Sequence, residues 1–147
     1  MNLQPPDPPT TPRARALLPL AAVLLAALVL RLWLWEAIPR QGFISDEGEY
    51  LSAAWWLAHG RGFDWYQGYL WTRAPLYPLF LAAHLRLFGD ALAPIAVTQT
   101  LLSLLNIALV YLLARRIAPP LLSAAPTIAA LATAFYLPFA IYPQALL

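Results

Sequence analysis

The chain has 147 residues, of which 61% are hydrophobic and only 11% charged, and its mean hydropathy is +0.63. A soluble domain of this size cannot bury so much apolar surface, because interior volume grows slowly with chain length. The composition therefore predicts a protein that is embedded in a lipid membrane. The net charge of +2 is too small to indicate nucleic-acid binding. The absence of cysteine excludes disulfides and thiolate chemistry, and with only two histidines we expect no metal site and no cofactor.

Residues 1–15 are rich in proline and poor in apolar side chains, so this segment is expected to be disordered. The apolar run behind it predicts a first membrane span over residues 16–35, because a membrane-crossing helix needs about 20 apolar residues. The run exceeds the apolar part of a typical secretory signal, which favours a retained signal anchor. Arg31 lies in this span close to its outer end, and we expect its guanidinium to snorkel toward water. The alternative is that Arg31 faces the helix bundle and binds an anion.

Two further spans are predicted from the apolar runs. The second covers residues 94–113 and stops before a pair of arginines, and the third covers residues 121–141. Pro126 and Pro138 interrupt the third run. Membrane helices tolerate such prolines when neighbouring groups satisfy the freed carbonyls.

Arginines near the ends of the spans indicate the orientation of the chain. Arg13 and Arg15 precede the first span, and Arg115 and Arg116 follow the second. Cytoplasmic flanks are enriched in such residues, so both flanks are expected to be cytoplasmic. The sequence thus predicts a multi-pass protein of the cell (inner) membrane with a cytoplasmic N-terminus and an external loop over residues 36–92.

The external loop is predicted to contain two helices. One is expected over residues 46–60, because acids favour the first turn of a helix and glycine favours its end. The other is expected over residues 76–88, between a proline and a glycine. Both are too short to cross a bilayer and carry bulky apolar residues, so they are expected to lie in the membrane interface. The predicted fold is an all-α integral membrane protein with about three transmembrane helices and these two interfacial helices.

Three of the chain's seven carboxylates, Asp46, Glu47 and Glu49, fall within four consecutive positions close to a predicted span. Helix capping explains one or two of them and is worth roughly 1 kcal/mol. The functional alternative makes Asp46 a general base that takes a proton from an attacking hydroxyl. Glu47 points to a different face of the helix, where it could hold a sugar hydroxyl or a cation. Glu49 and Tyr50 return to the face of Asp46 and are candidate substrate-binding residues.

Arg73 is the candidate phosphate-binding residue, because arginine binds phosphate through a planar fork and this one precedes a predicted interfacial helix. The alternative role is an anchor for lipid head groups. His59 and His84 have weaker claims, since His59 lies near a helix end, where a cation is favourable for structural reasons.

The order of these elements resembles the polyprenyl-phosphate-sugar-dependent glycosyltransferases of the GT-C superfamily, such as protein O-mannosyltransferases and lipid A aminoarabinose transferases. In these enzymes, as in this chain, a first span is followed by an external loop that opens with an acidic motif. The motif here is Asp46-Glu47-Gly48-Glu49-Tyr50. The stretches LAHGRGF, RAPLYPLFLAAHLRLFG and QTLLSLLNIALVYLLARRI extend the resemblance, which covers about residues 16–147.

The resemblance implies inverting transfer of a sugar from a polyprenyl-phosphate carrier to a hydroxyl of an acceptor glycan, lipid or protein on the extracytoplasmic side. It places the catalytic carboxylate on Asp46, with Glu47 beside it, and the phosphate-contacting basic residue on or near Arg73. Because such enzymes have many more spans, the chain is expected to be the N-terminal portion of one and to be inactive alone. The alternative is a small non-catalytic membrane protein, a scaffold or assembly subunit, whose acids only cap a helix. A transporter segment is disfavoured, since charged residues avoid the middle of the predicted spans.

Overall fold

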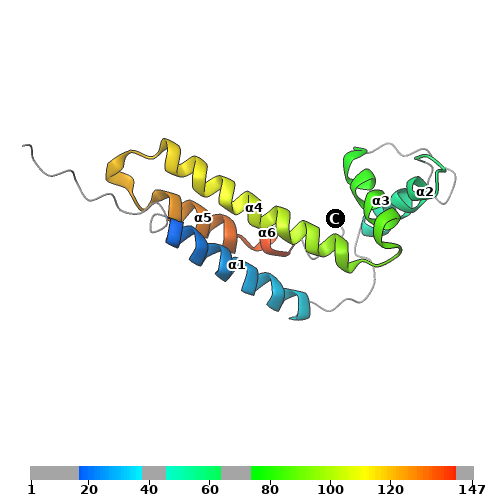
Figure 1. Cartoon of the computed structure of the whole chain (residues 1–147), viewed down its shortest axis with the longest axis horizontal. Helices are drawn as coiled ribbons and strands as arrows, with labels where there is room; N and C mark the ends of the chain where they lie inside the picture. Colours follow the sequence, from blue (N-terminus) through cyan, green and yellow to red (C-terminus); the bar gives the residue numbers. More distant parts are fainter. Residues whose placement is uncertain (1–16, 38–45, 64–73, 142–147) are drawn as a thin grey trace, which may run out of the picture.

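The computed structural model describes residues 17–37, 46–63 and 74–141 (Figure 1). Every regular element in these ranges is a helix, which confirms the predicted all-α class. In chain order the elements are α1 (Leu18–Ala37), α2 (Glu47–Ala58), α3 (Leu76–Phe88), α4 (Ala93–Ile117), the short 3-10 helix η2 (Pro120–Leu122), α5 (Ala125–Phe135) and α6 (Leu137–Ile141).

Among the described residues, two helices are long and apolar enough to cross a membrane, α1 and α4. At 1.5 Å per residue, the 20 residues of α1 span about 30 Å, the thickness of a bilayer's hydrocarbon core. The first predicted span is confirmed as a helix. The second predicted span is also a helix, but α4 continues through Arg115 and Arg116 instead of stopping before them. Cations are favourable in a last helical turn, because they face its unpaired carbonyls.

The third predicted span is divided into α5 and α6 instead of forming one helix. Tyr136, between them, is extended, with φ −63° and ψ 111°. The backbone N–H of Tyr136 still bonds to Ala132, and the next bonded turn runs from Ala140 back to Tyr136. Pro138 lacks the N–H that a continuous helix would use here. It is accommodated in the first turn of α6, where a missing donor is tolerated.

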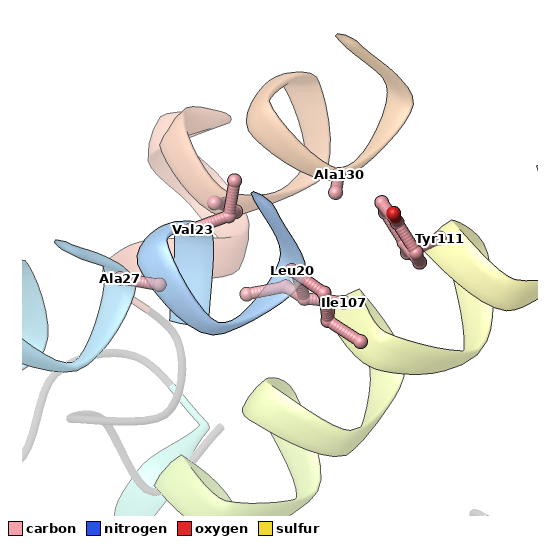
Figure 2. Packing of buried hydrophobic residues seen from close by; sticks show 7 residues of the cluster. Leu20, Val23, Ala27, Ile107, Tyr111 and Ala130 are labelled. Carbon is pink, nitrogen blue, oxygen red and sulfur yellow. The ribbon is translucent and has the colours of Figure 1, made fainter. Parts of the chain in front are cut away.

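Helices α1, α4 and α5 form a bundle whose core is made of small and branched side chains and one tyrosine. The N-terminal half of α1 packs on the C-terminal half of α4, so these two helices run antiparallel (Figure 1). Figure 2 shows this core from close by. Alanines at the contacts let the helix backbones approach closely, which is how helices associate in lipid. The buried residues of this core are Leu20, Val23, Ala27, Ile107, Tyr111, Ala130 and Ala134.

Helices α2 and α3 form a separate pair at the end of the bundle where α4 begins (Figure 1). Tyr50 meets Tyr77 near the start of both helices, with ring centroids 5.3 Å apart. Near their ends, Arg86 of α3 donates from Nε to the carbonyl oxygen of Ala58 at 3.0 Å. The two helices therefore run in the same direction. A second core, made of Ala54, Leu81, Ala82, Leu85 and Ile95, joins this pair to the first turn of α4.

The boundaries of α2 and α3 agree with the predicted ones. Helix α2 begins after Asp46 and is followed by Gly60, whose φ is 74°. Helix α3 begins after Pro75 and ends at Gly89, whose φ is 67°. An L side chain at either glycine would be strained, because positive φ is readily adopted only by glycine.

Candidate functional site

The acidic cluster lies at the N-terminal end of α2, as predicted. Asp46 is the N-cap residue, and its carbonyl oxygen accepts the first helical hydrogen bond from Tyr50 at 3.0 Å. Its side chain makes no capping hydrogen bond. Asp46 therefore occupies the N-cap position, but its carboxylate does not bond to the backbone N–H groups of the first turn. The acids of the first turn, Glu47 and Glu49, still lie where the helix dipole favours negative charge.

Glu47 is the most buried of the three acids, at 6% exposure, whereas Asp46 and Glu49 are half-buried. A carboxylate is costly to bury unless polar groups surround it. The negative charge of Glu47 acts on the phenol of Tyr77, so the carboxylate faces the α3 side of the pair. Glu47 is thus turned inward, toward the contact between α2 and α3.

Tyr77 is held between three elements. Its ring packs edge-on against Tyr50 of α2, and its hydroxyl accepts a hydrogen bond from Nε2 of Gln99 of α4 at 2.8 Å. Burial, aided by electrostatic interaction with Glu47 and Tyr50, raises the pKa of Tyr77 to about 12, and the Gln99 bond opposes this rise. The phenol is therefore neutral over the physiological range. It can position a ligand as a hydrogen-bond donor, but it cannot act as a base.

The predicted phosphate-binding residue, Arg73, lies outside the described residues. The described arginines of the α2–α3 pair lie at its opposite end. The Arg61 guanidinium is 4.9 Å from the ring of Trp56, a cation–π contact, and Arg86 binds the end of α2. With about 18 Å of helix between that end and Asp46, neither arginine shares a site with the acids.

Both histidines make local structural contacts. Nδ1 of His59 lies 2.8 Å from the carbonyl oxygen of Trp55, one turn earlier. His84 lies between the Phe80 carbonyl oxygen and the Thr98 hydroxyl, each 2.9 Å from a ring nitrogen, and so links α3 to α4. Within the described ranges, no three side chains of His, Cys, Asp or Glu are close enough together to hold a metal ion.

Arg31 does not snorkel, so the preferred expectation for this residue is wrong. The side chain is 1% exposed and points into the bundle. Nη1 donates to the Ala27 carbonyl oxygen at 3.0 Å, and Nη2 donates to Oγ of Ser103 at 2.7 Å and to the Phe139 carbonyl oxygen at 3.2 Å. The last bond satisfies a carbonyl of α6, where a short helix leaves its acceptors unpaired. Arg31 therefore connects α1, α4 and α6.

An apolar groove of about 420 Å³ lies beside Arg31, between α1 and α4. Its volume falls in the range of roughly 300–1,000 Å³ that is typical of ligand pockets. The lining residues are Leu28, Arg31, Leu32, Trp35, Ala96, Val97, Thr100 and Leu101. The groove is at the end of the bundle that carries the α2–α3 pair, because it involves the first turns of α4.

Sequence reasoning did not single out Tyr77, Gln99 or Ser103. Gln99 and Ser103 are polar residues four positions apart inside a predicted span, and polar groups at such depth usually bind a neighbour. That signal was available. Tyr77 lies in an aromatic-rich helix, and nothing in its immediate sequence distinguishes it from its neighbours.

Comparison of the chain with protein families, curated proteins and solved structures finds no match.

Proposed function

We propose that the chain is an integral membrane protein in which α1 and α4 cross the bilayer and α5 with α6 forms a third crossing. The exposed faces of these helices are covered with large apolar side chains. Exposed apolar surfaces of this extent mark contact with a membrane or another protein. Helices α2 and α3 lie in the outer interface, supported by exposed apolar residues on α3 such as Leu76 and Leu87. Arg115 and Arg116 then lie at the cytoplasmic end of α4, together with the N-terminus.

The function that this arrangement supports best is transfer of a sugar from a polyprenyl-phosphate carrier to an acceptor hydroxyl at the outer membrane surface. One observation carries the proposal. The Asp46 carboxylate lies at the start of α2 and makes no side-chain capping hydrogen bond there. The resemblance of its motif to the GT-C enzymes supports the same role.

In the proposed reaction, Asp46 takes the proton of the acceptor hydroxyl as that oxygen attacks the anomeric carbon of the sugar. The bond between this carbon and the carrier phosphate oxygen breaks, and its electron pair stays with the phosphate. Arg73 is the proposed cation for the departing phosphate, since a fixed positive charge stabilises the charge that develops there. The remaining acids have supporting roles. Glu47, together with Tyr77, forms one side of the proposed substrate site. Glu49 and Tyr50 lie on the side of the site that would hold the acceptor.

A non-catalytic scaffold is the second candidate. It is favoured by the contacts among Glu47, Tyr50, Tyr77 and Gln99, which join α2, α3 and α4 and would be useful without any reaction. The two candidates differ in what they require of Asp46, because the scaffold makes no use of its carboxylate as a base.

The experiment replaces Asp46 by asparagine in the gene at its native locus and measures sugar transfer in isolated membranes. Labelled hexoses and pentoses on polyprenyl phosphate serve as donors. Loss of a general base is expected to lower the rate about 10²–10⁴-fold. Asp90→Asn is the matched control, because Asp90 is an exposed acid beyond the end of α3 and should leave transfer unchanged. Transfer by Asp46→Asn at the control rate, with equal protein in the membrane, would contradict the proposal and favour the scaffold.

A further inference from the structure

The groove between α1 and α4 combines an apolar wall with one buried cation. Leu28, Leu32, Val97 and Leu101 supply most of the wall, and Arg31 lies in its lining. The outer rim is open to the surroundings, since Leu32, Val97 and Leu101 are each more than half exposed. A ligand can therefore enter sideways from the surface of the bundle.

The charge of Arg31 is not balanced by its hydrogen-bond acceptors. The Ala27 and Phe139 carbonyl oxygens and the Ser103 hydroxyl are all neutral. Moreover, its buried Nε has no hydrogen-bond partner among the residues that the structure describes. Buried charges are normally paired, and a buried donor without an acceptor is unfavourable. The groove therefore contains a positive charge, on Arg31, that a bound anion would neutralise.

From this juxtaposition we infer that the groove binds an anionic phospholipid of the outer leaflet, with the phosphate against Arg31 and an acyl chain along the apolar wall. A free phosphate ion would leave that wall uncovered. A phospholipid brings both parts together, because its phosphate oxygens accept hydrogen bonds from the guanidinium and its chain replaces water or lipid at the exposed leucines. The position in the outer part of α1, near Trp35, corresponds to the depth at which lipid head groups meet aromatic side chains.

This inference goes beyond sugar transfer and does not depend on it. The competing explanation is that Arg31 is only a structural link between α1, α4 and α6. Both roles use the same guanidinium, so a useful test must separate charge recognition from folding.

The test measures which phospholipids stay on the protein. The purified full chain is placed in nanodiscs with equal amounts of phosphatidylglycerol and phosphatidylcholine carrying the same acyl chains, and native mass spectrometry counts the retained lipids. We expect the wild type to retain one phosphatidylglycerol with about tenfold preference, which corresponds to about 1.4 kcal/mol. Arg31→Met should remove the preference, and Arg31→Lys should keep part of it, because the charge remains without the planar fork.

Groove-filling variants test the site without touching Arg31. Leu101→Trp places a bulky ring in the groove and should reduce retained phosphatidylglycerol about tenfold. Leu102→Trp is the matched control, because Leu102 is a similarly exposed neighbour outside the lining and should retain lipid like the wild type.

Four results would overturn the inference. The first is equal retention of both phospholipids by the wild type, and the second is an unchanged preference in Arg31→Met or Leu101→Trp. The third is a lipid-free dimer that Leu101→Trp converts to a monomer, since this would make the groove an interface between two copies. Displacement of the retained phospholipid by an equimolar polyprenyl phosphate would also overturn it, since the site would then belong to the sugar carrier.

Discussion

Ser103 is the side chain through which α4 receives the Arg31 guanidinium. Its Oγ accepts from Nη2 at 2.7 Å and lies 3.3 Å from the Phe139 carbonyl oxygen, to which it donates. Ser103→Ala removes both bonds and leaves one guanidinium donor unsatisfied. A hydrogen bond to a charged group contributes about 1.5–3 kcal/mol, so the free energy of unfolding in detergent should fall by about that amount. Ser123→Ala, at an exposed site between α4 and α5, should change it by less than about 0.5 kcal/mol. Equal stability of the two variants would show that the Ser103 bonds contribute nothing.

Tyr77 makes a second prediction at the level of single residues, in the alkaline range. Its pKa of about 12 in the folded protein lies above the ordinary tyrosine value of 10. Between these values the folded state holds a proton that the unfolded state has lost. This contribution to stability is complete below about pH 10 and is lost as the pH rises toward 12. The slope attributable to Tyr77 is at most about 1.4 kcal/mol per pH unit and is smaller in practice, because the phenol is only partly buried. The difference in phenolate absorbance between wild type and Tyr77→Phe should titrate near pH 12, and a midpoint at pH 10 would contradict the structure.

How far the sequence predicts the site depends on the residue. The location of Asp46 at a helix start follows from local preferences, so it was predictable. The burial of Glu47 depends on α3 packing beside α2. The buried position of the Arg31 guanidinium depends on α6, which is distant in sequence. Snorkelling was the reasonable local expectation for Arg31, and tertiary packing overrode it. The expectation for Arg73 stays a prediction, because it lies outside the described residues.

At the level of elements, glycine and proline predicted the ends of α2 and α3 correctly, because these residues restrict the backbone locally. Gly89 is the sharpest case. Its φ of 67° and ψ of −157° lie in a region that only glycine adopts readily. A Cβ atom added there would meet no other atom within 4 Å, so any effect of a substitution arises from backbone strain alone.

Gly89→Ala should therefore destabilise the chain by about 1–3 kcal/mol. The free energy of unfolding in detergent is the measurement, and Asp90→Ala at the neighbouring exposed position is the control. If the two variants unfold alike, the backbone at Gly89 does not have the positive φ described above.

The division of the third predicted span shows where prediction from local sequence ends. Both prolines of the run lie at helix boundaries, but only Pro138 lies at the junction of two α-helices. Pro126 lies in the first turn of α5, where its missing N–H is harmless. Pro138 has a helix before it as well as after it, so the backbone must change direction at Tyr136. Which proline interrupts a helix depends on where that helix starts, and periodicity does not define this start in a uniformly apolar run.

For the whole molecule, the three-element bundle was predictable as apolar runs, whereas the parallel pairing of α2 and α3 was not. Two helices can pack in either direction with the same apolar faces. The pairs Tyr50–Tyr77 and Ala58–Arg86 select the parallel arrangement, and these contacts are not visible in either helix alone.

The proposed orientation can be tested with single cysteines, because the natural chain has none. His59→Cys, after α2, should react with a membrane-impermeant maleimide in intact cells. Ser123→Cys, between α4 and α5, should react only after the membrane is permeabilised. The unsubstituted chain is the control for background labelling. Equal labelling of both positions in intact cells would contradict a bundle with α4 crossing once between them.

The link between Arg31 and Phe139 has a consequence for biosynthesis. The two residues are 108 positions apart, so at about 5–20 residues per second the acceptor is made roughly ten seconds after the arginine. During that interval the Arg31 guanidinium lacks its α6 acceptor, and for the first 72 residues it also lacks Ser103, so that only the Ala27 carbonyl oxygen is already in place. In the proposed membrane helix α1, such a cation costs up to about 3 kcal/mol. The nascent helix should therefore remain at the insertion machinery or extend Arg31 to the surface until α6 emerges. In the newly made chain the Arg31 side chain then snorkels to the surface, and in the complete protein it forms the buried link to Phe139.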